Sequence, residues 1–248
     1  MLILGDIGNS ETKLFLVNSK GKILRRTSFQ SKLMTNSILS KKFKTLTHNF
    51  RNIKKILFCS VVPKNFLLIK KFISKKTKIR CHEIKELNLR SIMNIKADYK
   101  QVGSDRLANA ISLLNNKDNF IILDFGTATT FDVIIGKSYR GGVIAPGISI
   151  SLNTLTDKAS LIPKINLKKI KNVIGIDTNS AVRSGFFWGY AGLIDNIINL
   201  IKKETRKSYN VIITGGFSEL FKRSIKTKVI ENRNITVRGL VKISKLIK

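Results

Sequence analysis

The chain has 248 residues, of which 43% are hydrophobic and 25% charged, a balance typical of a globular protein and not of a disordered one. No apolar run approaches the ~20 residues that a membrane-spanning helix needs, so we expect no such helix. The formal net charge is +31, but the lysines are scattered between apolar segments without interleaved aromatic residues, which favours a solvated basic surface over a nucleic-acid platform.

The first predicted element is a strand–turn–strand hairpin over residues 2–17, LILGDIGNSETKLFLV, whose turn begins at Asp6. The first half continues with strands over 23–29 and 55–62 and helices over 38–49, 66–75 and 103–114. Apolar residues at three- and four-residue spacing indicate the last two helices. The polar segment NNKDN at 115–119 is typical of a linker and predicts two domains, 1–117 and 118–248.

The second half opens with a hairpin that repeats the first. Residues 120–135 read FIILDFGTATTFDVII, which aligns Asp124 with Asp6 and Gly126 with Gly8. The pattern then predicts strands over 138–144 and 210–214, helices over 146–155 and 178–201, and the start of a helix over 218–222. Two hairpins with matching turns, half a chain apart, predict a duplicated α/β domain in two lobes with a cleft between them.

Both hairpin turns carry the groups that a phosphate site needs, namely a carboxylate, a glycine and hydroxyl, amide or amine donors. Asp6, Gly8 and Lys13 supply these groups in the first half, and Asp124 and Thr127 in the second. One such turn alone is more often only a turn. Because it occurs twice at equivalent places, the pattern predicts an ATP site.

The segment Gly103-Ser104-Asp105-Arg106 opens a predicted helix. An anion placed there would meet free backbone N–H groups and the positive end of the helix dipole. Asp105 and Arg106 are adjacent and therefore point in different directions, which suits the two ends of one substrate. The alternative interpretation is a capped helix start with a surface ion pair.

Two glycine-rich segments follow strands in the second half. Thr214-Gly215-Gly216 closes an apolar strand, and the missing side chains would let a flat ring such as adenosine approach the backbone. GGVIAPG at 141–147 leaves a strand through Pro-Gly into a helix, where backbone N–H groups would face a phosphate.

Together these motifs resemble those of the type III pantothenate kinases over essentially the whole chain. The matching blocks are DIGNS at 6–10 with Lys13, CSVVP at 59–63, VGSDR at 102–106, DFGTATTFD at 124–132, GGVIAPG at 141–147, TGG at 214–216 and Gly239-Leu240. The resemblance implies duplicated RNase H-like (actin-like) domains and phosphorylation of pantothenate by ATP to 4′-phosphopantothenate, the first step of coenzyme A biosynthesis. It also implies a homodimer, Mg²⁺, and K⁺ or NH₄⁺ as a monovalent cation.

The resemblance assigns roles residue by residue. The first ATP-phosphate loop would consist of Asp6, Ile7, Gly8, Asn9, Ser10, Glu11, Thr12 and Lys13, with Asp6 meeting Mg²⁺ through the phosphates. Gly103, Ser104, Asp105 and Arg106 would bind pantothenate, with Asp105 as general base. On chemical grounds, the planar guanidinium of Arg106 would anchor the substrate carboxylate. Asp124 would hold the monovalent cation, Thr127 would contact the phosphates, and Thr178 would contact substrate at the partner subunit's site.

Three positions depart from the family pattern. Ser10 stands where Thr is more usual, and Ser104 where Ala is more usual; both replacements are small. Lys96 stands where many members have an aromatic residue, with Tyr99 nearby, so the substrate-contacting aromatic residue is left open.

Two alternatives stay open. One is a non-catalytic regulatory or nucleic-acid-associated protein on the same scaffold, which the charge of +31 keeps in view. The other is a kinase for another small hydroxylated metabolite. The intact Asp6, Asp105 and Asp124 favour catalysis, and we expect no specific binding of nucleic acid.

The remaining features concern the compartment. The start of the chain shows no basic leader, long apolar run or cleavage site, which predicts a cytoplasmic protein. Cys59 and Cys81 have no pairing pattern, which favours free thiols. His48 and His82 lack spacing partners among Cys, Asp and Glu, so no zinc site is predicted.

Overall fold

The computed structural model describes residues 1–47 and 49–247, which divide into two compact units. Unit 1 takes its described residues from 1–115, 137–139 and 234–247, and unit 2 consists of 116–136 and 140–233. The chain leaves unit 1 close to the predicted boundary at 117, and its last helix returns to unit 1. The assignment of a ligand to each lobe stays a prediction.

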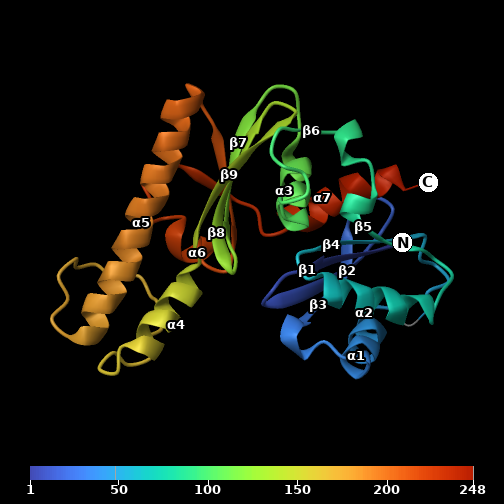
Figure 1. Ribbon diagram of the computed structural model, residues 1–248, viewed down its shortest axis with the longest axis horizontal. Helices are drawn as coiled ribbons and strands as arrows, with labels where there is room; N and C mark the ends of the chain where they lie inside the picture. Colours follow the sequence, from blue (N-terminus) through green and yellow to red (C-terminus); the bar gives the residue numbers. More distant parts are fainter. Residues whose placement is uncertain (48, 248) are drawn as a thin grey trace. The chain divides into compact units, whose positions relative to one another are not determined.

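Unit 1 contains a five-stranded sheet in the order β3-β2-β1-β4-β5 (Figure 1). Its strands are β1 (Leu2–Ile7), β2 (Glu11–Val17), β3 (Ile23–Gln30), β4 (Lys55–Ser60) and β5 (Cys81–Glu83). The first three strands are antiparallel, whereas β4 and β5 run parallel to β1. The short strand β6 (Asn94–Ile95) pairs with Ser138 and Tyr139.

Helices cover both faces of this sheet. The four helices are α1 (Asn36–Leu46), α2 (Pro63–Ser74), α3 (Ser104–Leu113) and α7 (Ile235–Ile243). On one face, Ile3 and Ile7 of β1 join a buried core with Phe43 of α1 and Ile69 of α2. Side chains alternate along a strand, so Asp6 points to the opposite face, where α3 and α7 pack against β1 and β4.

Short 3₁₀ turns complete unit 1: η1 (Ser31–Leu33), η2 (Ile84–Glu86), η3 (Leu89–Ser91) and η4 (Ser244–Leu246). The helices α3 and α7 pack side by side, with their backbones in close approach. A Cβ atom built at Gly239 of α7 would lie 1.8 Å from the carbonyl oxygen of Ala108 in α3. Only glycine permits this approach, which brings the α7 backbone directly against α3.

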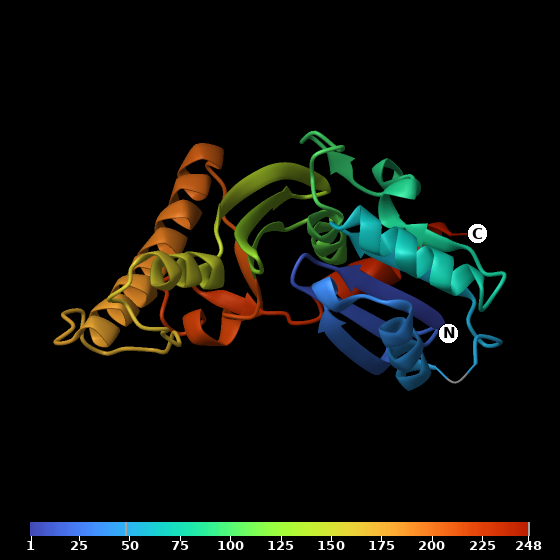
Figure 2. The same cartoon turned by 60° about the horizontal axis from the view of Figure 1, so that its bottom comes forward.

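Unit 2 is a sheet in the order β11-β10-β7-β8-β9 with α4, α5 and α6. Its strands are β7 (Asn119–Phe125), β8 (Ala128–Ile135), β9 (Ser138–Pro146), β10 (Asn210–Gly215) and β11 (Val229–Glu231), and its helices are α4 (Ile148–Lys158), α5 (Thr178–Thr205) and α6 (Ser218–Phe221). Phe187 and Ile194 of α5 are fully buried in one core with Leu123 of β7. Figure 2 shows α4 beside α5, which it contacts.

The predicted hairpins are both confirmed: β1 pairs with β2 and β7 with β8, each antiparallel. The helix predicted over 38–49 begins earlier, at Asn36, where Thr35 caps it, and it ends at Leu46. His48 lies outside the described residues. The helix predicted from 66 begins at Pro63, because proline suits the first position of a helix.

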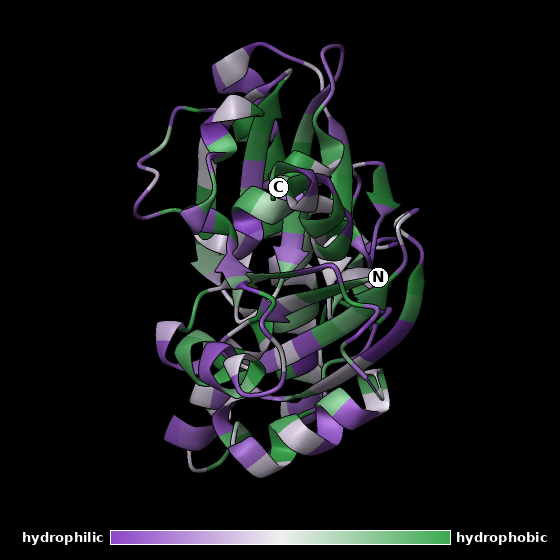
Figure 3. Ribbon diagram, turned by 90° about the vertical axis from the view of Figure 1, so that its right-hand side faces the viewer, coloured by the Kyte–Doolittle hydropathy of each residue, from purple (hydrophilic) through white to green (hydrophobic). Residues whose placement is uncertain are grey.

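Hydropathy follows the fold. In Figure 3 the strands are mostly hydrophobic, and the connecting loops are mostly hydrophilic. Within residues 1–47 and 49–247, no helix has the length and apolar character required to cross a membrane.

Candidate active site

In unit 1, three neighbouring strands present polar groups on one sheet face. Asp6 of β1 lies opposite Lys13 of β2 on one side and opposite Cys59 of β4 on the other. The Cys59 thiol lies 3.5 Å from an Asp6 carboxylate oxygen. Burial and then the charge of Asp105 raise the pKa of Asp6 to about 6, and Lys13 acts in the opposite direction. The face is therefore acidic, with one lysine beside it.

Hydrogen bonds to Gly8 stabilise the turn between β1 and β2. Gly8 N–H donates to the Glu11 carbonyl at 3.0 Å and closes the turn. The Ser31 hydroxyl donates to the Gly8 carbonyl at 2.6 Å and lies 2.9 Å from the hydroxyl of fully buried Thr12. Thr12 and Ile7 thus support the turn, while Asn9, Ser10 and Glu11 are exposed at its tip.

Ser31 was not singled out from the sequence. It lies 19 residues after Thr12 and follows a separate strand, so no local pattern links the two residues. Only the pairing of β2 with β3 brings Ser31 under the turn.

The start of α3 presents Asp105 on the same side of unit 1. Gly103 caps the helix, and a Cβ there would lie 2.5 Å from a carboxylate oxygen of Asp105, so a larger residue would displace that carboxylate. One Asp105 oxygen accepts the Arg106 backbone N–H at 2.8 Å. Burial raises the pKa of Asp105 above its ordinary value, and the Arg106 hydrogen bond and charge partly offset this. A carboxylate so placed is suited to accept a proton.

Tyr99, the aromatic residue near Lys96 in the sequence, contacts two basic side chains. The Tyr99 hydroxyl donates to the Lys85 carbonyl at 3.4 Å, and its ring lies 5.6 Å from the Lys85 Nζ and 5.6 Å from the Arg90 guanidinium carbon. The charge of Lys85 also lowers the pKa of Asp105. Which aromatic residue contacts the substrate therefore stays open.

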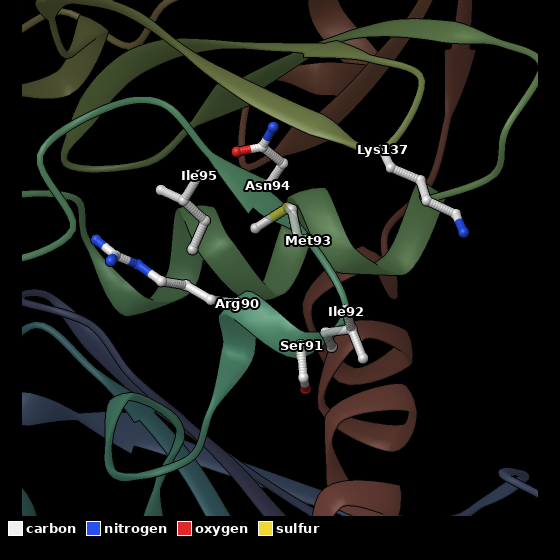
Figure 4. Close-up of a pocket in the computed structure, with 7 residues that line it drawn as sticks. All are labelled: Arg90, Ser91, Ile92, Met93, Asn94, Ile95 and Lys137. Carbon is white, nitrogen blue, oxygen red and sulfur yellow. The ribbon is translucent and has the colours of Figure 1, made fainter.

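A cavity of about 610 Å³ lies in unit 1. It is lined by Arg90, Ser91, Ile92, Met93, Asn94, Ile95 and Lys137 (Figure 4). The side chains of Arg90 and Lys137 point away from each other, so these two cations do not converge on one anion. None of the predicted site residues lines this cavity.

In unit 2, polar residues of three neighbouring strands lie side by side near the end of β7. Asp124 lies opposite Thr130 of β8 on one side and opposite Thr214 of β10 on the other. Thr127 is exposed in the turn that follows, which the Gly126 N–H closes by donating to the Ala128 carbonyl at 3.1 Å. This arrangement repeats the hairpin geometry of unit 1. It also places three residues with side-chain oxygens, Asp124, Thr130 and Thr214, next to one another.

Two glycines bring further backbone against this turn. A Cβ at Gly147, the residue before α4, would lie 1.9 Å from the Thr127 carbonyl oxygen. Gly215 has φ +91° and would place a Cβ 2.4 Å from the Phe125 carbonyl oxygen. The neighbouring Gly216 donates its N–H to that same oxygen at 3.0 Å. The segments 141–147 and 214–216 thus meet the turn that carries Thr127.

Thr178 is the first residue of α5 and is exposed. The preceding Asp177 accepts the Ser180 N–H at 2.9 Å and forms a capping box with Ser180, so the helix start is fixed without Thr178. The Thr178 hydroxyl is not needed for the cap.

The structure therefore gathers two sets of predicted residues. Unit 1 brings Asp6, Lys13 and the Gly103–Arg106 segment to one side of its sheet. Unit 2 places Asp124 and Thr127 at one hairpin and Thr178 at the start of α5.

Solved structures with this fold include a protein from Campylobacter jejuni described as a Baf family transcriptional activator, with a TM-score of 0.60, 19% identity, and coverage of 98% of this chain and 97% of that one. A protein from Sinorhizobium meliloti described as a 2-dehydro-3-deoxygalactonokinase has a TM-score of 0.54 and 11% identity, covering 100% and 99% of the two chains. The fold is that of the actin-like ATPases and sugar kinases, as predicted.

Sequence comparison identifies the family within this fold class. The family model for type III pantothenate kinase matches residues 2–200. A type III pantothenate kinase from Pelagibacter ubique (strain HTCC1062) is 63% identical over 248 residues, covering 100% of both chains. The chain belongs to the type III pantothenate kinase family.

Proposed function

We propose that the protein transfers the γ-phosphoryl group of ATP to the primary hydroxyl of pantothenate, giving 4′-phosphopantothenate, the first step of coenzyme A biosynthesis. Family membership supports this reaction. The observation that carries it is the meeting of Asp6, Lys13 and Asp105 in unit 1. A phosphate-facing turn and a carboxylate with a raised pKa are the parts that phosphoryl transfer to a hydroxyl requires.

Each group has a role in this proposal. The turn over 6–13 holds ATP phosphates, with Lys13 opposite Asp6 supplying positive charge. Asp105 orients the acceptor hydroxyl and takes its proton as the bond to phosphorus forms. Arg106 binds the pantothenate carboxylate, because its guanidinium offers a planar pair of donors. Thr127, exposed at the second hairpin, contacts the phosphates.

The residues present suit the two cations that the family uses. Among the described residues no three His, Cys, Asp or Glu side chains gather into a metal site, so Mg²⁺ would be shared between Asp6 and the phosphates. Burial and then the charge of Asp105 raise the pKa of Asp6, so a cation beside this carboxylate would favour its ionised form. When bound, Mg²⁺ neutralises the charge of the phosphates. Asp124, with Thr130 and Thr214 beside it, would supply oxygen atoms to hold K⁺ or NH₄⁺.

The active protein is a cytoplasmic homodimer in this proposal, and Thr178 contacts substrate at the partner's site. Two observations in unit 2 support a second copy as partner. Ile174 and Ile176, just before α5, are 84% and 95% exposed. Along α5, Gly185 and Gly189 line an apolar groove of about 360 Å³ and have open space beside them, where another helix fits closely.

The experiment is a coupled assay of ADP release with and without pantothenate. ADP release that depends on pantothenate and yields 4′-phosphopantothenate supports the proposal. ADP release that pantothenate does not stimulate, but another polyol does, would point to a different acceptor. No ADP release with any acceptor would favour a regulatory protein on this scaffold.

A further inference from the structure

We propose that Glu83 is a positioning residue that fixes the helix start carrying Asp105 to the strand next to Asp6. Glu83 ends β5 and was not singled out from the sequence. It belongs to no hairpin turn and to none of the glycine motifs. The inference rests on the proposed role of Asp105 as general base.

Three donors from three places converge on the Glu83 carboxylate. One oxygen accepts the Lys85 N–H at 2.6 Å, and the other accepts the Ser60 N–H at 3.3 Å. The Ser104 side chain is also within hydrogen-bonding reach of this carboxylate and lowers its pKa. The Lys85 bond is local and caps the short helix η2, whereas the other two bonds join separate elements.

The interactions of Glu83 with Ser60 and with Ser104 reach the two parts of the proposed site, one beside Asp6 and one beside Asp105. Ser60 ends β4 directly after Cys59, whose thiol contacts Asp6, and it lies opposite Ile7 in the sheet. Ser104 is the first residue of α3, directly before Asp105, and only 3% of its surface is exposed. A single carboxylate thus ties the strand beside Asp6 to the residue beside Asp105.

The contacts at Gly103 show why this tie matters. A Cβ at Gly103 would lie 2.5 Å from Asp105 Oδ1 and 3.5 Å from a methyl group of Val61, the residue after Ser60. The start of α3 therefore lies close against the end of β4. A shift of α3 along β4 would move the Asp105 carboxylate relative to Asp6, and misplacement of a catalytic group by ~1 Å can cost ~10²-fold in rate.

The chemistry of the tie needs an ionised carboxylate. Two carboxylate oxygens can accept all three hydrogen bonds, whereas a glutamine offers one oxygen and turns its NH₂ toward a donor. Burial raises the pKa of Glu83, and its hydrogen bonds with Ser104, Lys85 and Ser60 act in the opposite direction. Its oxygens are used by neighbours, so Glu83 acts through Asp105 and not on the substrate.

The test is Glu83→Gln in the pantothenate-dependent assay. We expect kcat to fall by about tenfold or more while the KM for ATP stays within about twofold. Asp195→Asn in unit 2 is the matched control, because Asp195 also accepts three hydrogen bonds, from Lys226 N, Thr227 N and Thr227 Oγ1 at 2.8, 3.0 and 2.8 Å. That control should lose comparable thermal stability and keep kcat.

A double-mutant cycle separates positioning from general support. If Glu83 acts through Asp105, then Glu83→Gln should cost little more activity in the Asp105→Asn background. Additive losses would mean that Glu83 only supports the fold, and would overturn the inference. If Glu83→Gln does not fold, Glu83→Asp keeps the charge but shortens the reach of the carboxylate toward Ser60 and Ser104, and it should lower kcat several-fold with the ATP KM unchanged.

The outcomes also separate this inference from the proposed function. Wild-type kcat in folded Glu83→Gln, with Asp105→Asn inactive, would refute the role of Glu83 and leave the reaction standing. A wild-type protein that releases no ADP with pantothenate would refute the proposed function itself. An Asp105→Asn variant with wild-type kcat would refute both the base and the residue proposed to position it.

Discussion

Asp6 and Asp105 lie close enough in unit 1 for the charge of Asp105 to raise the pKa of Asp6, after burial the largest cause of that shift. Asp6 comes from β1 and Asp105 from the first turn of α3. Two neighbouring carboxylates repel each other unless positive charge lies between or beside them. The proposed function divides this pair: one carboxylate would serve the cation and phosphates, and the other would take the proton.

The first prediction tests that division. Asp105→Asn is nearly isosteric and should lower kcat by at least ~10² while ATP binding is kept, because the proton acceptor is lost. The measurement is steady-state ADP release with pantothenate, with ATP affinity from titration. Asp98→Asn is the control: its carboxylate is engaged by Lys100 N and Gln101 Nε2 at 2.9 and 2.8 Å, and its loss should leave kcat intact. Turnover of Asp105→Asn within a few-fold of wild type would place the base elsewhere.

The second prediction concerns pH. The base works only when it is ionised, and burial raises the pKa of Asp105 above its ordinary value of 3.8. Activity should therefore be lost as the pH falls through this raised pKa, with kcat/KM dropping about tenfold per pH unit below it. The acid limb should lie above that of an exposed aspartate, and the residual activity of Asp105→Asn should lack it. A flat kcat/KM profile down to pH 4 would contradict the assignment.

The third prediction concerns the monovalent cation at Asp124. Potassium or ammonium should activate the enzyme, and Asp124→Asn should remove both this dependence and most activity, because the charged ligand is gone. The measurement is turnover in buffers that differ only in K⁺, NH₄⁺ or Na⁺. Equal turnover of the wild type in Na⁺ and K⁺ buffers would count against a cation at this position.

The fourth prediction tests the shared site. Thr178→Val should raise the pantothenate KM by an amount corresponding to ~1–2 kcal/mol, the value of a lost hydroxyl contact. Thr205→Val at the other end of α5 is the matched control; its hydroxyl donates to the Ile201 carbonyl at 2.7 Å, and its loss should leave KM unchanged. Sedimentation should show a dimer at assay concentrations. A fully active monomer is incompatible with this arrangement.

The fifth prediction addresses the net charge of +31. If the positive charge forms only a solvated surface with no specific binding role, duplex DNA should bind without sequence preference. Its affinity should then fall steeply between low and physiological salt. The measurement is a salt titration with specific and scrambled duplexes. Sequence-selective binding that survives physiological salt would support the regulatory alternative.

The parts of the fold that the sequence predicted are those in which local pattern and tertiary role agree. The hairpins at Asp6 and Asp124 repeat one turn chemistry, and α2, α3 and α5 carry regular apolar spacing. The strand β5 was not predicted, because three residues with a polar centre make no pattern of their own. It exists through pairing with β4, and for that reason Glu83 escaped notice.

The helix α7 was missed for a different reason. Its sequence, ITVRGLVKI, is rich in β-branched residues and has a central glycine, which lowers helix propensity. Tertiary packing reverses this preference, since Gly239 lets the α7 backbone meet Ala108 of α3. Likewise, strand pairing alone brings the buried Thr12 and Ser31 together, so no local sequence pattern predicts their contact.

The return of α7 to unit 1 sets an order of assembly during synthesis. Most of unit 1 leaves the ribosome first, yet the helix that packs on α3 and on β1 is made only after all of unit 2. The face of the first sheet that carries Asp6 therefore stays without its α7 cover while unit 2 is translated. Asp105 therefore reaches its final support only after α7 has followed unit 2 out of the ribosome, so unit 1 cannot complete this face on its own during synthesis.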